Sequence, residues 1–139
     1  MSKQILTIHT GDIHLTDKKP LARVDEPDWY KAQFRVLEWL MKYKQGSHIV
    51  IGGDLFDSPS ISFKLLNQCS HYFSAEYCTA VIGNHEQPNK NEIGVEDSVF
   101  TTGHLMSLYT GIIQPKILYI HGVLYGFIPA SNSEDFFLK

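Results

Sequence analysis

The sequence predicts an α/β fold in which a mostly parallel sheet is flanked by helices. Short apolar segments rich in β-branched residues alternate along the chain with segments of helical periodicity, a pattern typical of strand–helix–strand units. Three of the apolar segments run straight into glycine and polar residues, as buried parallel strands do where they reach a ligand site. The 139 residues are enough for one domain with its own core, so we treat 1–139 as a single domain.

The individual elements are predicted from apolar runs, periodicity and turn residues. In chain order they are a buried strand at 4–9, a helix at 27–44, a strand at 48–51, a helix at 60–73, a strand at 77–82, a partly helical stretch at 92–108 and a hairpin at 116–128. The first helix carries apolar side chains at +4, +7 and +11 from Tyr30, which form one helical face. The hairpin is predicted to turn at His121-Gly122, and the terminal EDFFLK looks like the start of a further element.

The composition excludes several classes of protein. A net charge of −3 gives the whole chain no basic surface for tight, sequence-independent nucleic-acid binding, although a nuclease can carry positive charge on metal ions. Cys69 and Cys78 have no metal-ligand spacing and form no disulfide framework, which indicates buried thiols in a reducing cytoplasm. No segment approaches the ~20 apolar residues of a membrane span, and the N-terminus does not have the pattern of a signal peptide. We therefore expect a cytoplasmic protein that does not enter a membrane.

Polar side chains follow each of the first three predicted strands. The clusters are GDIH with Asp12 and His14, GGDLFD with Asp54 and Asp57, and GNHE with Asn84, His85 and Glu86. Because the carboxyl ends of parallel strands lie at one edge of a sheet, these side chains are expected to converge. Carboxylate, amide and imidazole groups suit Mn, Fe, Zn or similar divalent ions, and Asp54 on the central strand is the natural bridge between two ions. The alternative is that the clusters are polar turns, with Asp12 and Asn84 capping turns or helices.

The three clusters, in this order, resemble the metal-binding motifs of the calcineurin-like metallophosphoesterase superfamily. Within it the chain is most similar to SbcD-type nuclease subunits of bacterial and phage recombination complexes. Three features carry the finer resemblance: the segment KAQFRVLEWLMKYKQGSHIVIGGDLFD, the Pro59-Ser60 pair that opens a helix after LFD, and VLYGFIPA at 123–130. The resemblance covers essentially the whole chain, and Glu86 departs from the aspartate that is commoner in the nuclease branch.

The resemblance implies a role for each motif residue. Asp12 and His14 would ligate the first metal, Asp54 would bridge both metals, Asn84 would ligate the second metal and touch the scissile phosphate, His85 would protonate the leaving oxygen, and Asp57 would orient His85. Lys18 and Lys19, in the loop after His14, are candidates for phosphate contacts, the alternative being solvated loop charges. The implied reaction is in-line hydrolysis by metal-activated water, with no covalent enzyme intermediate.

The function that this resemblance implies is metal-dependent hydrolysis of DNA phosphodiesters by the nuclease subunit, or a fragment of it, of an SbcCD-type repair and recombination complex. The implied cofactors are two divalent ions, first of all manganese and otherwise iron, zinc or magnesium. The implied partners are DNA and an SbcC-like ATPase, in the cytoplasm or, for a phage protein, the host cytoplasm. Two alternatives stay open: a catalytically weak or inactive homologue that acts as a binding or inhibitory module, and a phosphoesterase acting on another phosphodiester or on phosphoproteins.

The later histidine motifs of the superfamily have no match after Glu86. We therefore expect the chain to correspond to the first half of the fold, with an incomplete shell for the second metal and poor metal affinity. Three explanations are open: a fragment of a longer protein, a naturally short protein, or a site completed by His104, His121 or a second copy of the chain. A half-fold would leave sheet surface uncovered, which favours a homodimer or a partner chain.

Overall fold

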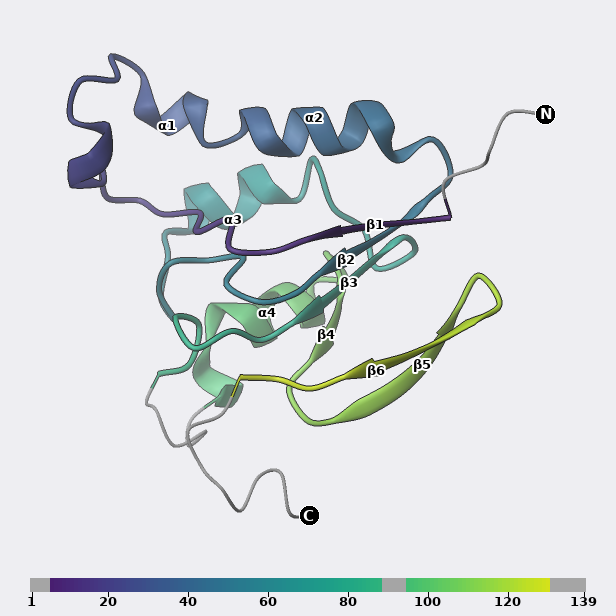
Figure 1. Cartoon of the computed structure of the whole chain (residues 1–139). Helices are drawn as coiled ribbons and strands as arrows, with labels where there is room; N and C mark the ends of the chain where they lie inside the picture. Colours follow the sequence, from purple (N-terminus) through teal and green to yellow (C-terminus); the bar gives the residue numbers. More distant parts are fainter. Residues whose placement is uncertain (1–5, 89–94, 131–139) are drawn as a thin grey trace.

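The computed structural model describes residues 6–88 and 95–130. Its main sheet has four parallel strands in the order β1-β2-β3-β4, so each strand pairs with the next one in the chain (Figure 1). The strands are β1 Thr7–Thr10, β2 His48–Ile51, β3 Cys78–Val81 and β4 Thr110–Ile112. A separate antiparallel hairpin pairs β5 Lys116–Ile120 with β6 Val123–Phe127. The predicted α/β fold with a parallel sheet is confirmed.

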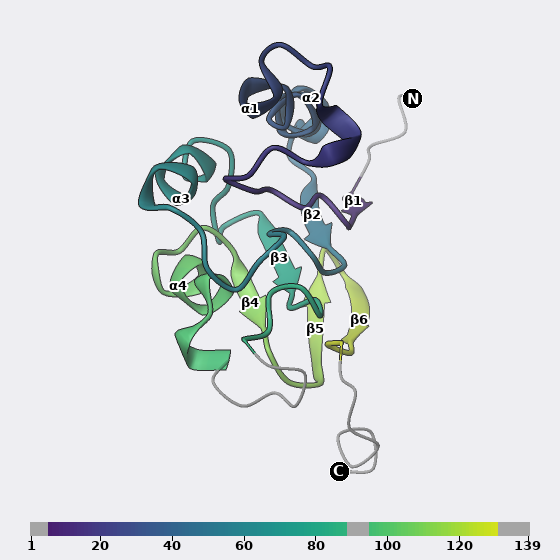
Figure 2. The same cartoon turned by 90° about the vertical axis from the view of Figure 1, so that its left-hand side faces the viewer.

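The α-helices pack on one side of the sheet (Figure 2), and they and two short 3-10 helices connect the parallel strands in the described part of the chain. They are η1 Leu21–Arg23, α1 Trp29–Ala32, α2 Arg35–Lys44, α3 Phe63–Cys69, η2 Val95–Asp97 and α4 Val99–Leu105. Strand–helix–strand connections are almost always right-handed, so strands placed in sequential order carry their helices on the same face. The opposite face is left for the hairpin.

The apolar stripe predicted from Tyr30 faces the larger core. Phe34 and Leu37 are buried there, and Tyr30 and Met41 pack against it. The predicted helix at 27–44 is divided into α1 and α2, because the N–H of Phe34 donates to a carbonyl three residues back (3.0 Å) and tightens the turn. The apolar side chains therefore lie on one face of both α1 and α2, and their burial packs the α1–α2 segment against the sheet.

The β5–β6 hairpin covers the other face of the sheet. The residues buried between them are Val50, Val81, Ile112, Ile120 and Phe127. Tyr125 reaches across to β1, where its hydroxyl lies 2.9 Å from Oγ1 of Thr7. At the turn, His121 and Gly122 have φ values of 49° and 80°, as a tight two-residue hairpin turn requires. The predicted hairpin and its turn position are confirmed.

Two strands differ from the sequence predictions. The strand expected to be buried at 4–9 is observed at Thr7–Thr10, where it pairs on one side only. Its side chains are half-buried, and His9 is exposed beside the ring of Tyr125 at 5.6 Å between centroids. The expectation of a buried first strand is therefore wrong, because an edge strand has one open side. Strand β4 was not predicted.

The strand predicted at 48–51 is observed at these bounds, and the other predicted elements keep their type and become shorter. The helix expected at 60–73 begins after Ser62, whose hydroxyl accepts the N–H of Leu65 at 3.1 Å and caps the helix. The stretch at 92–108 is partly helical in its described part, as expected, whereas EDFFLK lies outside the described residues. Among the described residues, no helix is long and apolar enough to cross a membrane.

Candidate metal centre

The loops that follow β1 and β2 run side by side beyond the sheet edge. The N–H of Asp12 donates to the carbonyl of Gly53 at 3.1 Å, and the N–H of His14 donates to the carbonyl of Asp54 at 2.9 Å. Leu15 then forms an isolated parallel bridge with Phe56. The two loops therefore continue the pairing of their strands, and this places the first polar cluster directly against the second.

Three residues of these loops have left-handed backbone conformations. The φ values are 50° at Asp12, 53° at His14 and 50° at Asp54. Such values are uncommon outside glycine, and each costs of order 1–3 kcal/mol. The hydrogen bonds between the two loops hold all three residues in this conformation. Strain concentrated at one place is a mark of a functional site.

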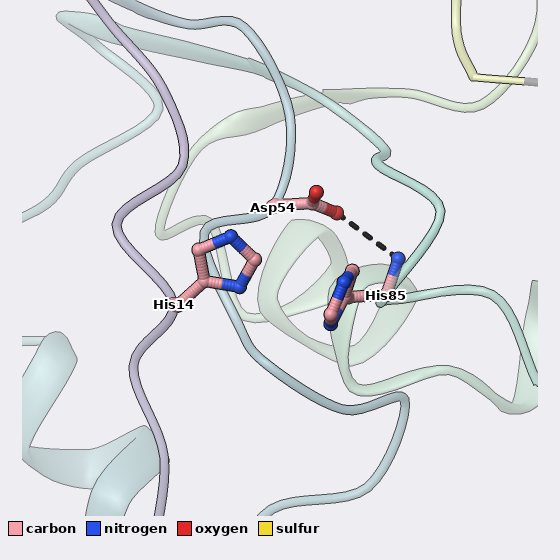
Figure 3. A group of neighbouring side chains, drawn as sticks. All are labelled: His14, Asp54 and His85. Atoms are coloured by element: carbon pink, nitrogen blue, oxygen red, sulfur yellow. Dashed lines mark hydrogen bonds between the residues drawn. The ribbon is translucent and has the colours of Figure 1, made fainter. Parts of the chain in front are cut away.

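His14, Asp54 and His85 meet at the edge of the sheet, one from the loop after each of the first three strands (Figure 3). One possible ligand atom of each residue lies within 4.8 Å of those of the other two. Asp54 is buried and its Oδ1 accepts the backbone N–H of His85 at 3.0 Å. The convergence expected from the strand ends is thus observed for these three side chains.

Asp57 lies between the two imidazole rings. Its Oδ1 is 3.0 Å from Nδ1 of His14 and 3.2 Å from Nδ1 of His85. Nδ1 of His14 is hydrogen-bonded to this carboxylate and Nδ1 of His85 to the backbone carbonyl of Asp57 at 3.3 Å, so Nε2 of each ring is the nitrogen left for another partner. For His14 that nitrogen lies 3.8 Å from Oδ1 of Asp12. The expected pairing of Asp57 with His85 is present as a contact and is shared with His14; the orienting role of Asp57 stays a prediction.

Glu86 holds together two of the loops that form the site, a role that was not predicted from the sequence. The side chain is completely buried, and its carboxylate accepts the N–H of Phe56 at 2.9 Å and that of Gly83 at 2.8 Å. Burial raises the pKa of Glu86 from its ordinary value of 4.5 to about 7, with a smaller raising effect from the Asp54 carboxylate and an opposing effect of these N–H groups. Glu86 therefore ties the loop after β2 to the loop after β3.

The other predicted site residues occupy the surface around this cluster. Asp12 and Asn84 are exposed, and their metal-binding roles stay predictions. Lys18 and Lys19 both line a hollow of about 360 Å3 that also includes Asp57. Nζ of Lys19 donates to two carbonyls of its own loop, at 2.7 and 3.1 Å. Its ammonium group is therefore occupied within the protein, whereas that of Lys18 has no such contact among the described residues.

The two later histidines lie elsewhere. Nδ1 of His104 accepts the N–H of Gly111 at 3.1 Å, which joins α4 to β4. His121 lies at the hairpin turn beside His48, the first residue of β2, at 6.3 Å between ring centroids. This is the end of the sheet opposite to Asp54. Neither residue belongs to the metal-ligand group found among the described residues, so the idea that one of them completes it is wrong for this conformation.

The donor set fits a divalent metal ion. Imidazole and carboxylate groups in one place are the ligands that zinc, iron and manganese accept, and His14, the expected ligand, already carries a carboxylate on its Nδ1, as metal-bound histidines usually do. The strained backbone and the buried Asp54 would also be compensated by a cation. Among the described residues, this group is the one with metal-ligand geometry.

The fold and this cluster define a metal-binding α/β domain with its site at the carboxyl edge of a parallel sheet. The family model of calcineurin-like phosphoesterases matches residues 5–137, and the chain belongs to this family. Membership implies divalent metal ions and the metal-dependent hydrolysis of phosphoesters. No curated protein matches the sequence.

Proposed function

We propose that this chain hydrolyses DNA phosphodiesters as the nuclease subunit, or as part of the nuclease subunit, of an SbcCD-type recombination and repair complex. The observation that carries the hydrolytic part is the meeting of His14, Asp54 and His85 within 4.8 Å at the ends of three successive strands. Manganese is the metal we propose first, and DNA and an SbcC-like ATPase are the partners.

The side chains of the site divide the work of hydrolysis. Asp12, His14, Asp54 and Asn84 would hold the ions, which when bound supply positive charge to the phosphate and lower the pKa of a water molecule. His85 is exposed at the cluster and would give a proton to the leaving oxygen. Asp57, 3.2 Å from its Nδ1, would hold that ring in place.

The assignment to a DNA nuclease is supported by sequence features and by the position of Lys18. The α1–α2 pattern before GGDLFD, the Pro59-Ser60 pair and the segment 123–130 resemble the nuclease branch. Lys18 is exposed and lines the hollow next to Asp57, where an ammonium group can contact a DNA phosphate. DNA is therefore the phosphodiester that we propose.

A second candidate substrate is a different phosphodiester or a phosphoprotein. Glu86 favours it, because glutamate after the GNH sequence matches other branches of the superfamily better than the nuclease branch. Its buried carboxylate holds Phe56 and Gly83 in place and does not itself select a substrate. A catalytically weak homologue that binds a partner is the third candidate.

The test combines metal binding with cleavage. The purified chain is titrated with Mn(II) by calorimetry and assayed on single-stranded and double-stranded DNA, on a simple phosphodiester and on a phosphopeptide. Asp54→Asn removes the buried carboxylate charge, and Asp25→Asn is the matched control because Asp25 is an exposed loop carboxylate away from the cluster. We expect saturable Mn(II) binding and DNA cleavage that Asp54→Asn abolishes and Asp25→Asn preserves.

Each other outcome selects an alternative. Cleavage of the phosphopeptide or the simple diester without DNA cleavage would favour the second candidate. Saturable metal binding without any cleavage would favour the weak homologue. A folded chain that binds no Mn(II), Zn(II) or Fe(II) would contradict the metal centre itself.

A further inference from the structure

A second hollow adjoins the metal-binding cluster and shares Thr16 and Pro20 with the hollow of Lys18. It has a volume of about 400 Å3 and includes His14, so it opens directly beside the cluster. One wall comes from the α1–α2 segment, where Trp29, Ala32, Gln33 and Val36 follow the spacing of a single helical face. Ligand pockets in proteins have volumes of about 300–1,000 Å3, so this cavity can hold a small organic group.

Gln33 lines this cavity and also carries an unpaired donor. The residue is 9% exposed, and its Oε1 accepts the backbone N–H of Thr16 at 2.9 Å. That bond fixes which end of the amide is oxygen. Its Nε2 is buried and has no hydrogen-bond partner among the described residues. Buried donors are rarely left without an acceptor, so the position calls for an acceptor carried by something that enters the cavity.

The rest of the cavity wall is aromatic and cationic. Trp29 is half-buried and contributes an indole ring. Arg23 and Arg35 also line the cavity, and both approach the same carboxylate, that of Glu26, at 3.6 and 3.0 Å. The described residues that line the cavity thus include two guanidinium groups and no carboxylate. An aromatic face, an amide donor and guanidinium groups are the means by which proteins bind unstacked nucleic-acid bases.

The two hollows give a phosphodiester room on both sides. The cavity of Trp29 includes His14, and the hollow of Lys18 includes Asp57, while both share Thr16 and Pro20. A phosphate held at the cluster would therefore have the cavity of Trp29 on the side of His14 and the hollow of Lys18 on the side of Asp57. No aromatic side chain is among the described residues that line the hollow of Lys18, whereas Trp29 lines the other cavity, so the cavity of Trp29 is the one that suits an aromatic ring.

We propose that the cavity lined by Trp29, Gln33 and Arg35 binds the nucleobase of the nucleotide next to the scissile phosphate. The inference rests on the proposed action on phosphodiesters and adds a base-binding subsite to it. Trp29 stacks on the base, Gln33 donates from its free amide N–H to a ring nitrogen or carbonyl of the base, and Arg35 provides positive charge at the rim. The metal ligands hold the phosphate, one sugar away.

The first test uses Trp29 as a reporter and needs no catalysis. The chain contains two tryptophans, and Trp39 is 55% exposed on α2 beside Tyr43. In Trp39→Phe, Trp29 is the sole indole; in Trp29→Phe, Trp39 is. Adding deoxynucleoside monophosphates should quench Trp39→Phe fluorescence saturably, and Trp29→Phe fluorescence hardly at all. Deoxyribose 5-phosphate and inorganic phosphate, which lack the base, should quench neither variant.

The second test separates the subsite from the reaction. Thymidine 5′-(4-nitrophenyl phosphate) and methyl 4-nitrophenyl phosphate share one leaving group and differ in the base. Trp29→Ala should raise KM for the thymidine diester roughly tenfold, as the loss of one stacking contact does, and leave KM for the methyl diester unchanged. Gln33→Glu, which keeps an oxygen acceptor for the N–H of Thr16 and removes the amide donor, should raise KM for the thymidine diester alone, which checks the cavity without removing the aromatic ring.

The outcomes distinguish the two proposals. If the unmodified chain cleaves neither diester and no DNA, the proposed hydrolysis fails, and saturable base-dependent quenching of Trp29 would still support the cavity. If both diesters are cleaved and the two substitutions affect them equally, or if quenching does not require the base, the base-binding subsite is overturned while hydrolysis stands.

Discussion

A Cβ atom on Gly83 would overlap the carboxylate and the backbone nitrogen of Asp54. The two residues come from the loops after β3 and β2, and the missing side chain is what lets the buried aspartate lie against the third loop. Gly83 also donates its N–H to Glu86 at 2.8 Å. Gly83, which follows β3, must therefore be a glycine because Asp54 lies so close to it. Its backbone does not require a glycine, since its φ is not in the left-handed region.

Substituting Gly83 with alanine should damage the metal centre. The methyl group would force Asp54 away from His14 and His85, so we expect Mn(II) affinity to fall at least tenfold by calorimetry, following the loss of a correctly placed ligand. Overpacking should also lower the free energy of unfolding by about 1–3 kcal/mol in urea denaturation. Gly126→Ala is the control, because a Cβ there meets nothing within 4 Å. Equal effects of the two substitutions would contradict this explanation.

Because Asp57 contacts both imidazoles, its substitution should lower both the metal affinity and kcat. Asp57→Asn keeps the size of the side chain and removes the charge that faces both Nδ1 atoms. We expect metal affinity to fall by about 10- to 100-fold, as loss of such outer partners does, and kcat to fall at saturating metal because His85 is less well held. Asp25→Asn should change neither value. A loss of affinity that leaves kcat intact at saturating metal would mean that Asp57 serves His14 alone.

Much of the fold followed from the sequence because its strands are short, apolar and closed by glycine. β2 was predicted at its observed bounds, and the turn at His121-Gly122 was located correctly. β4 was missed because three residues with a central glycine carry no periodicity. The first strand was predicted to be buried, and the exposure of His9 was missed, because a local sequence pattern does not indicate which strand lies at the edge of the sheet.

The candidate site was predictable as a set of residues and less so as a geometry. The meeting of His14, Asp54 and His85 follows from parallel strands with polar ends. The left-handed backbone at Asp12, His14 and Asp54 could not be foreseen, because none of them is glycine. The anchoring role of Glu86 was also missed, although an acidic residue three positions after the glycine that follows a buried strand can accept the N–H of that glycine.

The raised pKa of Glu86 predicts a pH dependence of stability. Because the pKa in the folded chain, about 7, exceeds the ordinary value of 4.5, the folded state binds the proton more tightly than the unfolded state. This contribution to stability is fully present below pH 4.5 and is lost as the pH rises through about 7. A shift of this size corresponds to at most about 3 kcal/mol.

The measurement compares wild type with Glu86→Gln by urea denaturation between pH 5 and pH 8, with a chelator present. Wild type should lose stability relative to the variant as the pH rises, because only wild type must ionise a buried carboxyl. Glu76→Gln is the control, since Glu76 is exposed, and it should follow wild type at every pH. A constant difference between wild type and Glu86→Gln would show that Glu86 does not titrate in this range.

Lys18 and Lys19 are neighbours in the chain, and the structure predicts opposite consequences for their loss. Nζ of Lys19 binds the carbonyls of Val24 and Glu26, so Lys19→Ala should loosen this loop and speed its cleavage by a protease, with little change in the salt dependence of DNA binding. Lys18 is exposed at the hollow next to Asp57. Lys18→Ala should leave protease resistance unchanged.

If Lys18 contacts a phosphate, its loss should also reduce the slope of log affinity for DNA against log salt by about 1. Fluorescence anisotropy on a short DNA at several salt concentrations, with Ca(II) in place of Mn(II) to slow cleavage, measures this slope. Because each lysine serves as the control for the other, a general loss of charge would change both slopes equally. That result would make both residues solvated loop charges, and the phosphate contact would have to come from elsewhere in the site.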